Sequence, residues 1–216
     1  MMPAPRVYNQ YHGDAPPGAI YIGRGSPWGN RFVIGEHGDR DQVCNRFACE
    51  QLPEMDVSGL TGEDLVCFCA PHRCHGDDIL LKANHRVVVF GGRKFSDRRW
   101  LYRALDRVHT RRAITCIIEG EASGADTLAR LWAKDRGVAV DPYPADWSNI
   151  ERPGALVRRN KAGKLYDALA GHVRNELMLR VGRPQLAIGF PGGTGTRDMT
   201  VRCLEFGLST WLPKPS

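Results

Sequence analysis

The sequence predicts an α/β protein with a doubly wound parallel sheet in its C-terminal part and a smaller α/β domain before it. From residue 86 onward, short β-branched runs alternate with segments of helical periodicity, which is typical of βαβ units. Glycine-containing loops follow three of the expected strands. Residues 1–83 carry 7 Lys and Arg against 11 Asp and Glu, whereas residues 84–216 carry 23 against 13. We therefore expect two domains, 1–83 and 84–216, of opposite charge.

The expected elements follow from apolar periodicity and from breaking residues. In the C-terminal part, strands are expected at 86–90, 114–118, 138–143, 185–190 and 208–212. Helices are expected after Ser96 as the N-cap, over 127–135 and over 197–206, with a long stretch of mixed character at 155–179. In the N-terminal part, helices are expected over 41–52 and 78–83, with a strand over 65–69.

The stretch Ile188–Met199 (IGFPGGTGTRDM) indicates a phosphate ligand. A strand runs into a glycine-rich loop that opens a helix, so backbone N–H groups and the positive end of the helix dipole can surround an anion. The residues expected to bind are Gly192, Gly193, Thr194, Gly195 and Thr196.

Two other glycine loops are expected beside this one, because loops at the carboxyl ends of parallel strands gather at one sheet edge. The residues they contribute to the expected site are Gly91, Gly92, Arg93, Gly120, Ser123 and Gly124. No G-x-G-x-x-G fingerprint follows the first strand, which disfavours a usual NAD-dependent dehydrogenase. The Walker lysine is also missing, which argues against an ordinary NTPase.

Residues 86–212 resemble the YspA-like branch of the SLOG superfamily, which includes the Lonely Guy phosphoribohydrolases and the DNA-processing protein DprA. The resemblance rests on five motifs in order: Phe90–Arg93, Gly120–Asp126, Tyr143–Trp147, Arg174–Met178 and Pro191–Thr196. It implies a Rossmann-like fold that holds a nucleotide across the strand ends, with Arg174 and Asn175 at the site. In the phosphoribohydrolases, an Arg and a Glu act on the N-glycosidic bond, and Arg174 occupies the position of that Arg, so the resemblance implies a catalytic role for Arg174. Relatives of this type are often dimers, which implies a homodimer.

The sequence departs from that pattern at Met199, which stands where the resemblance expects the catalytic Glu. A thioether cannot stabilise an oxocarbenium-like ribose or activate water, so the expected carboxylate is Asp198 or Asp126. The alternative for each is structural: Asp198 in the first helical turn, and Asp126 as the cap of the helix from Thr127. Two functions follow, hydrolysis of a nucleoside 5'-monophosphate or related ribosyl nucleotide, or non-catalytic sensing of ADP-ribose, NAD or a cyclic nucleotide. The +10 charge of residues 84–216 also permits a DprA-like nucleic-acid binder.

The N-terminal part concentrates its chemistry in residues 64–84, where Cys74 is expected at a helix N-terminus that favours its thiolate. Cys67, Cys69, Cys74 and His75 form either a zinc site, a thiol or histidine site for a small molecule, or a set of buried reduced cysteines. Residues 6–83 resemble an uncharacterised domain family common in phage and actinobacterial genomes, through Tyr21–Phe32 and Cys67–Asp77. This resemblance implies that Arg24, Asn30 and Asp77 share one pocket with the cysteines.

The apolar runs, the N-terminal residues and the cysteines of the sequence indicate the cellular compartment of the protein. No run of about 18 apolar residues is present, and the N-terminus lacks the order of charged and apolar residues of a signal peptide. Seven scattered cysteines do not form the pattern of a secreted disulfide framework. We therefore expect a cytoplasmic protein with a nucleotide ligand, no membrane partner and no certain cofactor, zinc being the one candidate.

Overall fold

The computed structural model describes residues 5–215, which form two compact units. The first unit runs to Asn84 and the second begins at His85. Each unit has its own hydrophobic core. No helix within residues 5–215 has both the length and the apolar character that crossing a bilayer requires.

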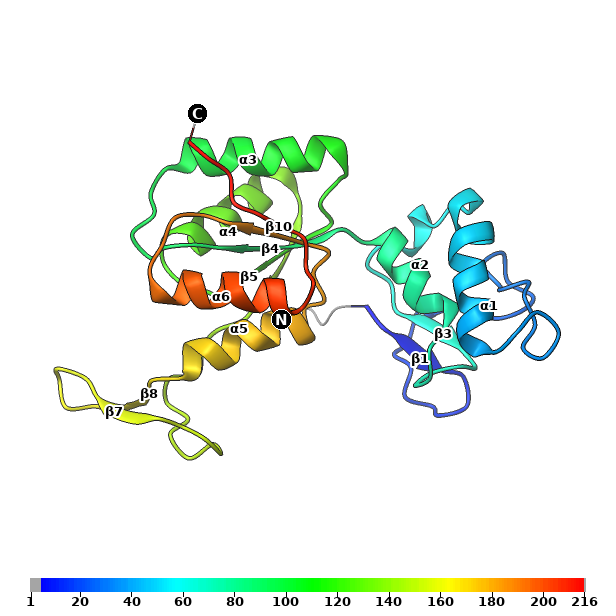
Figure 1. The fold of residues 1–216 in the computed structure, drawn as a ribbon, viewed down its shortest axis with the longest axis horizontal. Coiled ribbons are helices and arrows are strands. Elements are labelled where there is room, and N and C mark those ends of the chain that lie inside the picture. Colours follow the sequence, from blue (N-terminus) through cyan, green and yellow to red (C-terminus); the bar gives the residue numbers. More distant parts are fainter. Residues whose placement is uncertain (1–4, 216) are drawn as a thin grey trace. The chain divides into compact units, whose positions relative to one another are not determined.

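The second unit is built on a five-stranded parallel sheet, which confirms the predicted fold class (Figure 1). Its strands stand in the order β10-β9-β4-β5-β6. They are β4 (Arg86–Phe90), β5 (Cys116–Glu119), β6 (Ala139–Pro142), β9 (Leu186–Gly189) and β10 (Thr210–Trp211). The chain moves outward from β4 to β6 and then returns to place β9 on the other side of β4. The strand order therefore reverses between β4 and β9.

Helices cover both faces of this sheet, as a doubly wound fold requires. They are α3 (Arg98–Arg111), α4 (Ala125–Arg136), α5 (Ala170–Arg180) and α6 (Thr194–Glu205). Alternate side chains of β4 point to opposite faces, so Val87 and Val89 pack with α3 and α4, while Val88 packs with Met178 of α5 and Met199 of α6.

The starts of α3 and α6 differ from those expected from the sequence. Asp97, not Ser96, caps α3, because its carboxylate accepts a hydrogen bond from the Trp100 N–H at 2.8 Å. Helix α6 begins at Thr194, three residues earlier than expected, so the last three residues of the glycine loop form its first turn. The helix therefore starts inside the loop that was expected to precede it.

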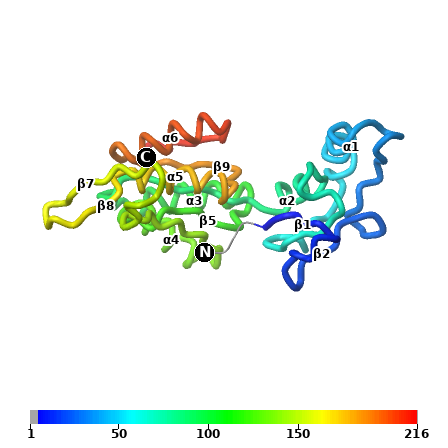
Figure 2. The backbone as a smooth tube through the Cα atoms, turned by 90° about the horizontal axis from the view of Figure 1, so that it is seen from below, coloured from blue at the N-terminus to red at the C-terminus, as the bar shows by residue number. Residues whose placement is uncertain are grey.

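The stretch 155–179 contains a hairpin that the sequence pattern did not indicate. Strands β7 (Val157–Arg159) and β8 (Leu165–Asp167) pair antiparallel and project away from the sheet (Figure 2). The carboxylate of Asp167 is fully buried at the base, where it pairs with Arg152 at 2.6 Å and accepts hydrogen bonds from the Leu156 and Leu169 N–H groups. These bonds fix the hairpin to the start of α5.

The first unit contains a three-stranded parallel sheet in the order β1-β3-β2. Its elements are β1 (Val7–Asn9), β2 (Ile20–Tyr21), β3 (Leu65–Cys67), α1 (Arg40–Arg46), the π-helix Phe47–Gln51, the 3-10 turns Leu52–Glu54 and Ser58–Leu60, and α2 (His75–Ala83). The expected strand over 65–69 ends at Cys67, so Cys69 lies in the loop. Helix α2 begins three residues before the expected start, and Cys74 is its N-cap.

A buried ion pair crosses the sheet of the second unit. Arg86 on β4 donates to the Asp141 carboxylate on β6 at 2.7 Å, and the Tyr143 hydroxyl donates to the same carboxylate at 3.0 Å. The side chains of Arg86 and Asp141 are only 7% and 0% exposed, so removal of one partner leaves a buried charge without compensation.

We expect Asp141→Ala to lower the free energy of unfolding of the second unit by about 3–5 kcal/mol, because Arg86 then stays buried and unpaired. Denaturant titration followed by tryptophan fluorescence measures this, since four of the five tryptophans belong to this unit. Asp135→Ala is the matched control, because its pair with Arg98 is exposed on both sides and contributes about 1 kcal/mol or less. Equal effects of the two substitutions would contradict the prediction.

Candidate functional site

The loops that follow β4, β5 and β9 meet at the carboxyl edge of the sheet. The Gly92 N–H donates to the Pro191 carbonyl at 2.9 Å, and the Ala125 N–H donates to the Gly92 carbonyl at 3.4 Å. A Cβ on Gly92 would lie 2.8 Å from the Pro191 carbonyl oxygen, and Gly124 adopts a left-handed φ of +81° against the Gly92 carbonyl. Only glycines allow these backbones to approach so closely.

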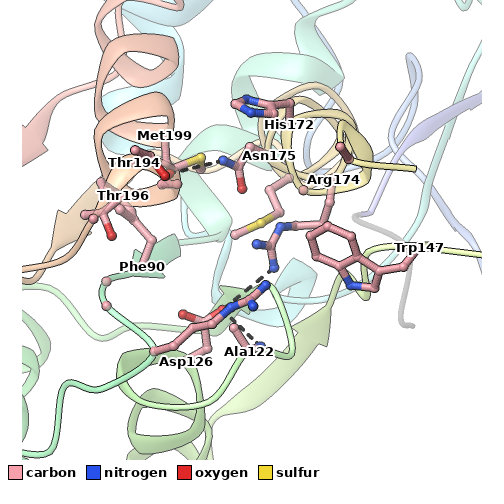
Figure 3. Close-up of a pocket in the computed structure, with 18 residues that line it drawn as sticks. Phe90, Ala122, Asp126, Trp147, His172, Arg174, Asn175, Thr194, Thr196 and Met199 are labelled. Atoms are coloured by element: carbon pink, nitrogen blue, oxygen red, sulfur yellow. Dashed lines mark hydrogen bonds and ion pairs between the residues drawn. The ribbon is translucent and has the colours of Figure 1, made fainter. Parts of the chain in front are cut away.

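A cavity of about 440 Å³ opens beside these loops, between the carboxyl ends of β4 and β9 (Figure 3). This is the point where the strand order reverses, which is the usual ligand position in open α/β sheets. The residues that line it come from all three loops, from Trp147 and from α5 and α6: Phe90, Gly91, Gly92, Arg93, Ala122, Asp126, Trp147, Ala168, Gly171, His172, Arg174, Asn175, Met178, Gly193, Thr194, Gly195, Thr196 and Met199.

The start of α6 forms one wall of this cavity. Gly193 is the N-cap of α6, and no side chain caps this helix end within the described residues. The first N–H groups of a helix have no partner within the helix, and the dipole makes this end positive. Asn175 fixes the wall from α5, because its amide donates to the Gly195 carbonyl at 3.4 Å and to Asp198 at 2.8 Å. The loop is therefore held in place while its helix start faces the cavity.

Arg174 and Asp126 form a second wall, and Figure 3 shows them turned toward each other. The Arg174 guanidinium donates to the Gly120 carbonyl and lies 3.9 Å from the Asp126 carboxylate. Asp126 is not the cap expected from the sequence, since Gly124 is the N-cap of α4. Its carboxylate instead accepts hydrogen bonds from the N–H groups of Gly120 at 2.9 Å and Ala122 at 3.3 Å.

Burial disfavours the charged forms of both Arg174 and Asp126. Desolvation lowers the pKa of Arg174, and the nearby Arg93 adds to that effect, while desolvation raises the pKa of Asp126. The Arg174 Nε is buried and has no hydrogen-bond partner in residues 5–215. A buried donor without an acceptor is costly, so the site lacks an acceptor that an anionic ligand can supply.

Asp198 does not line this cavity. Its carboxylate contacts His172 at 2.8 Å, Asn175 at 2.8 Å and Arg202 at 3.0 Å. Burial opposes its ionisation, but the hydrogen bonds from Asn175, His172 and Arg202 outweigh burial and lower the pKa of Asp198. Met199, which is 1% exposed, lines the cavity at the position where the resemblance expects a catalytic Glu.

Two further hollows share Arg93 and Trp147 with the main cavity. One of about 390 Å³ contains Gly120 and Ser123, and another of about 570 Å³ reaches Lys164 and Tyr166 of the hairpin region. The Arg93 guanidinium lies 5.5 Å from the Trp147 ring centroid, which is within cation–π range.

The sequence did not predict every residue that lines these cavities. The expected site residues did not include Trp147, His172, Met178 or the hairpin residues. The motifs Tyr143–Trp147 and Arg174–Met178 were the signals in the sequence that pointed to Trp147 and Met178.

In the first unit, the segment after β2 and the cysteine segment line one cavity of about 300 Å³. Of the residues expected there, Arg24, Asn30, Cys67, Cys69 and His75 line it. Cys74 and Asp77 do not line it but shape the start of α2, because Asp77 accepts from the Cys74 N–H at 3.1 Å and the Cys74 sulfur accepts from the Gly76 N–H at 3.4 Å. His75 is buried, and its Nε2 lies 3.0 Å from the Ile22 carbonyl.

The parallel order of the sheet and the helices on both faces define the second unit as a Rossmann-like α/β domain, with a cavity at the carboxyl edge where the strand order reverses. Residues 85–149 match the model of the YspA, cpYpsA-related SLOG family, and residues 7–85 match the model of DUF4326, a domain of unknown function. These matches confirm the resemblance drawn from the motifs. Arg174, Asn175 and the loop Pro191–Thr196 lie beyond the matched residues.

An X-ray structure of DNA processing protein A (DprA) from Streptococcus pneumoniae is similar to part of the chain, with 18% identity and a TM-score of 0.44. The match covers 61% of this chain and 51% of that protein, so it spans about half the length of DprA. Comparison with curated proteins gives no match. The SLOG match supports a function connected with nucleotides or nucleic acids.

We expect Asp198→Asn to lower the free energy of unfolding by about 1.5–3 kcal/mol at neutral pH, because three charged or polar partners lose their carboxylate. The pKa of Asp198 is lowered in the folded protein, so its contribution is present above the ordinary value of 3.8 and is lost as pH falls through the lower folded pKa. Unfolding curves of both proteins at pH 7 and below pH 4 measure this. A difference that stays constant over this range would contradict the prediction, and Glu205→Gln, at the exposed end of α6, is the control.

Proposed function

We propose that the second unit binds a nucleotide or a nucleotide-derived small molecule through its phosphate. The observation that carries this proposal is the combination, in one cavity, of an uncapped helix start, two arginines and an exposed tryptophan. The phosphate oxygens accept hydrogen bonds from the N–H groups of Gly193–Thr196 and are balanced by Arg93 and Arg174. The Trp147 ring offers a stacking surface for a base.

The role of Arg174 in ligand binding can be tested directly by substitution. Its guanidinium crosses above Gly120, where an added Cβ would collide with Nη1 of Arg174, and its Nε has no acceptor in the described structure. A ligand oxygen that accepts from this group relieves the cost of the buried donor and raises the pKa of Arg174 back toward its ordinary value.

We expect Arg174→Ala to weaken the binding of a nucleoside 5'-monophosphate by about 10-fold to 100-fold, because a charge-assisted hydrogen bond is worth about 1.5–3 kcal/mol. Isothermal titration calorimetry measures the dissociation constants. Arg180→Ala is the matched control, because Arg180 lies on the same helix but is exposed and pairs with Glu176. Unchanged affinity in Arg174→Ala would overturn the assignment of Arg174.

The substitution Gly120→Ala also tests whether Arg174 contributes to ligand binding, without removing the arginine. The added methyl group displaces the Arg174 guanidinium, so ligand affinity falls, whereas Gly59→Ala adds its methyl group to open space and leaves affinity unchanged. Circular dichroism and thermal unfolding of both variants establish that the fold is retained.

Hydrolysis of the N-glycosidic bond of a nucleoside 5'-monophosphate or related ribosyl nucleotide is the second candidate, and Asp126 favours it. Asp126 is the carboxylate that lines the cavity, whereas Asp198 is held by three other side chains. Its oxygen can stabilise positive charge on the ribose ring or take a proton from the attacking water, while the electrons of the broken bond move to the base nitrogen. Of the two expected carboxylates, we therefore propose Asp126 for the catalytic role.

If the domain hydrolyses nucleotides, we expect release of free base from one member of a panel of ribonucleoside and deoxyribonucleoside 5'-monophosphates, NAD and ADP-ribose. Burial raises the pKa of Asp126, so its ionised form, and with it the rate, increases as pH rises through that raised value. Chromatography detects the base, and Asp126→Asn abolishes its release while Asp198→Asn retains it. Release of no base, together with a ligand-dependent rise in melting temperature, identifies a sensor.

Nucleic acid is the alternative ligand class that the positive charge of residues 84–216 supports. Affinity for a nucleic-acid strand falls steeply with salt, whereas affinity for a mononucleotide changes little, so titrations at two salt concentrations separate these ligands. The homodimer implied by the family resemblance stays a prediction, which light scattering during size-exclusion chromatography tests.

A further inference from the structure

Three cysteine sulfurs of the first unit lie together although their residues come from different local structures. Cys67 ends β3, Cys69 lies in the following loop and Cys74 is the N-cap of α2. Their Sγ atoms all lie within 4.8 Å of one another, and Cys67 and Cys69 are 3.9 Å apart. Within residues 5–215 no other set of three or more His, Cys, Asp or Glu ligand atoms comes this close. All three cysteines are free thiols.

These spacings suit a metal ion better than a disulfide. A tetrahedral Zn²⁺ with Zn–S bonds of about 2.3 Å places its sulfur ligands about 3.8 Å apart. A disulfide requires its sulfurs about 2.05 Å apart, far below the separation of Cys67 and Cys69. Thiolate sulfur is a soft ligand that selects zinc over magnesium or calcium.

Within residues 5–215 the cluster supplies three ligands, one fewer than a closed tetrahedral zinc site contains. His75 was expected as the fourth ligand, but its ring nitrogens lie outside the close set. His75 Nε2 is 3.0 Å from the Ile22 carbonyl, and Nδ1 is 3.6 Å from the Cys74 sulfur. This histidine therefore packs beside the cluster and supports Cys74 from the second layer.

The surroundings of the cluster indicate what occupies the free position. Cys67 and Cys69 line the cavity of about 300 Å³, together with Arg24, Asn30 and Arg40. Three thiolates and one Zn²⁺ carry a net charge of about −1, which the neighbouring guanidinium of Arg40 offsets. A zinc site with three protein ligands and one open position is typical of catalytic sites, whereas structural sites are closed by four.

We propose that Cys67, Cys69 and Cys74 bind one Zn²⁺ whose fourth position opens to the cavity and holds water or a small ligand oxygen. All three ligand residues belong to the first unit. Its neighbours Arg24, Asn30 and Arg40 favour an exogenous ligand that carries a negative or strongly polar group.

The test measures metal in the full-length protein, purified under reducing conditions from cells supplied with zinc. We expect about one Zn²⁺ per chain by elemental mass spectrometry, and intense thiolate-to-metal charge-transfer absorption when Co²⁺ replaces it. Cys69→Ser and Cys74→Ser should weaken retention against a chelator by roughly 100-fold or more. The controls are Cys44→Ser, a buried thiol that lines the same cavity outside the trio, and Cys49→Ser, an exposed thiol. Both controls retain the metal.

A separate measurement tests whether the fourth coordination position is open. Addition of imidazole to the Co²⁺ protein should shift the d–d absorption bands, because a ligand enters the first coordination shell. Bands that do not respond to imidazole would contradict an open position. Wild-type protein that takes up neither Zn²⁺ nor Co²⁺ under reducing conditions would overturn the metal site altogether, and so would equal retention in the trio variants and the controls. The wild-type measurements decide the matter even where a cysteine variant fails to fold.

Discussion

The close approach of two loop backbones, after β4 and after β9, is the constraint on which the site of the second unit depends. The hydrogen bond from Gly92 to Pro191 joins the loops where the strand order reverses, and a side chain on Gly92 would separate them. Without this contact, the start of α6 and the Arg93 loop would not border a common cavity. The glycines thus act twice, since they permit the approach and they leave backbone N–H groups accessible to a ligand.

The second wall of the cavity consists of two buried charged side chains rather than backbone N–H groups. Arg174 and Asp126 are both buried, and the 3.9 Å between them gives an ion pair that compensates only part of their desolvation. Backbone N–H groups of the loop after β5 hold the Asp126 carboxylate, and the Gly120 carbonyl holds Arg174. Rigid neighbours therefore keep two charged groups in place at some cost in stability, an arrangement more common at functional sites than in structural cores.

The fold was predictable because its signals are local. The β-branched run Arg86–Phe90 and the alternation of strands and helices give the doubly wound sheet directly.

The side chains that complete the site could not be predicted as well from the sequence. Helix α6 starts at Thr194, and this start gives Met199 to the cavity and turns Asp198 toward His172, which lies 26 residues earlier in the chain. A difference of one residue on a helix rotates a side chain by about 100°, so spacing alone could not decide between them. The hairpin of β7 and β8 was missed because its strands are three residues long and the one buried side chain in them is the carboxylate of Asp167, which leaves no apolar alternation to detect.

Both units place their distinctive chemistry at the carboxyl ends of parallel strands. In the first unit, Arg24 follows β2 and Cys69 follows β3, and the Asn9 amide at the end of β1 donates to the carbonyls of Phe68 and Ala70 to shape the cysteine loop. Parallel strands expose their last carbonyls and the loops beyond at one edge, so neighbouring loops converge there whatever their sequence. The loop residues then determine the ligand. Glycines and arginines create a positive edge suited to an anion, whereas three thiols create a soft donor set suited to a thiophilic cation. One topological rule therefore accounts for the positions of two candidate sites of opposite chemical preference within a single chain.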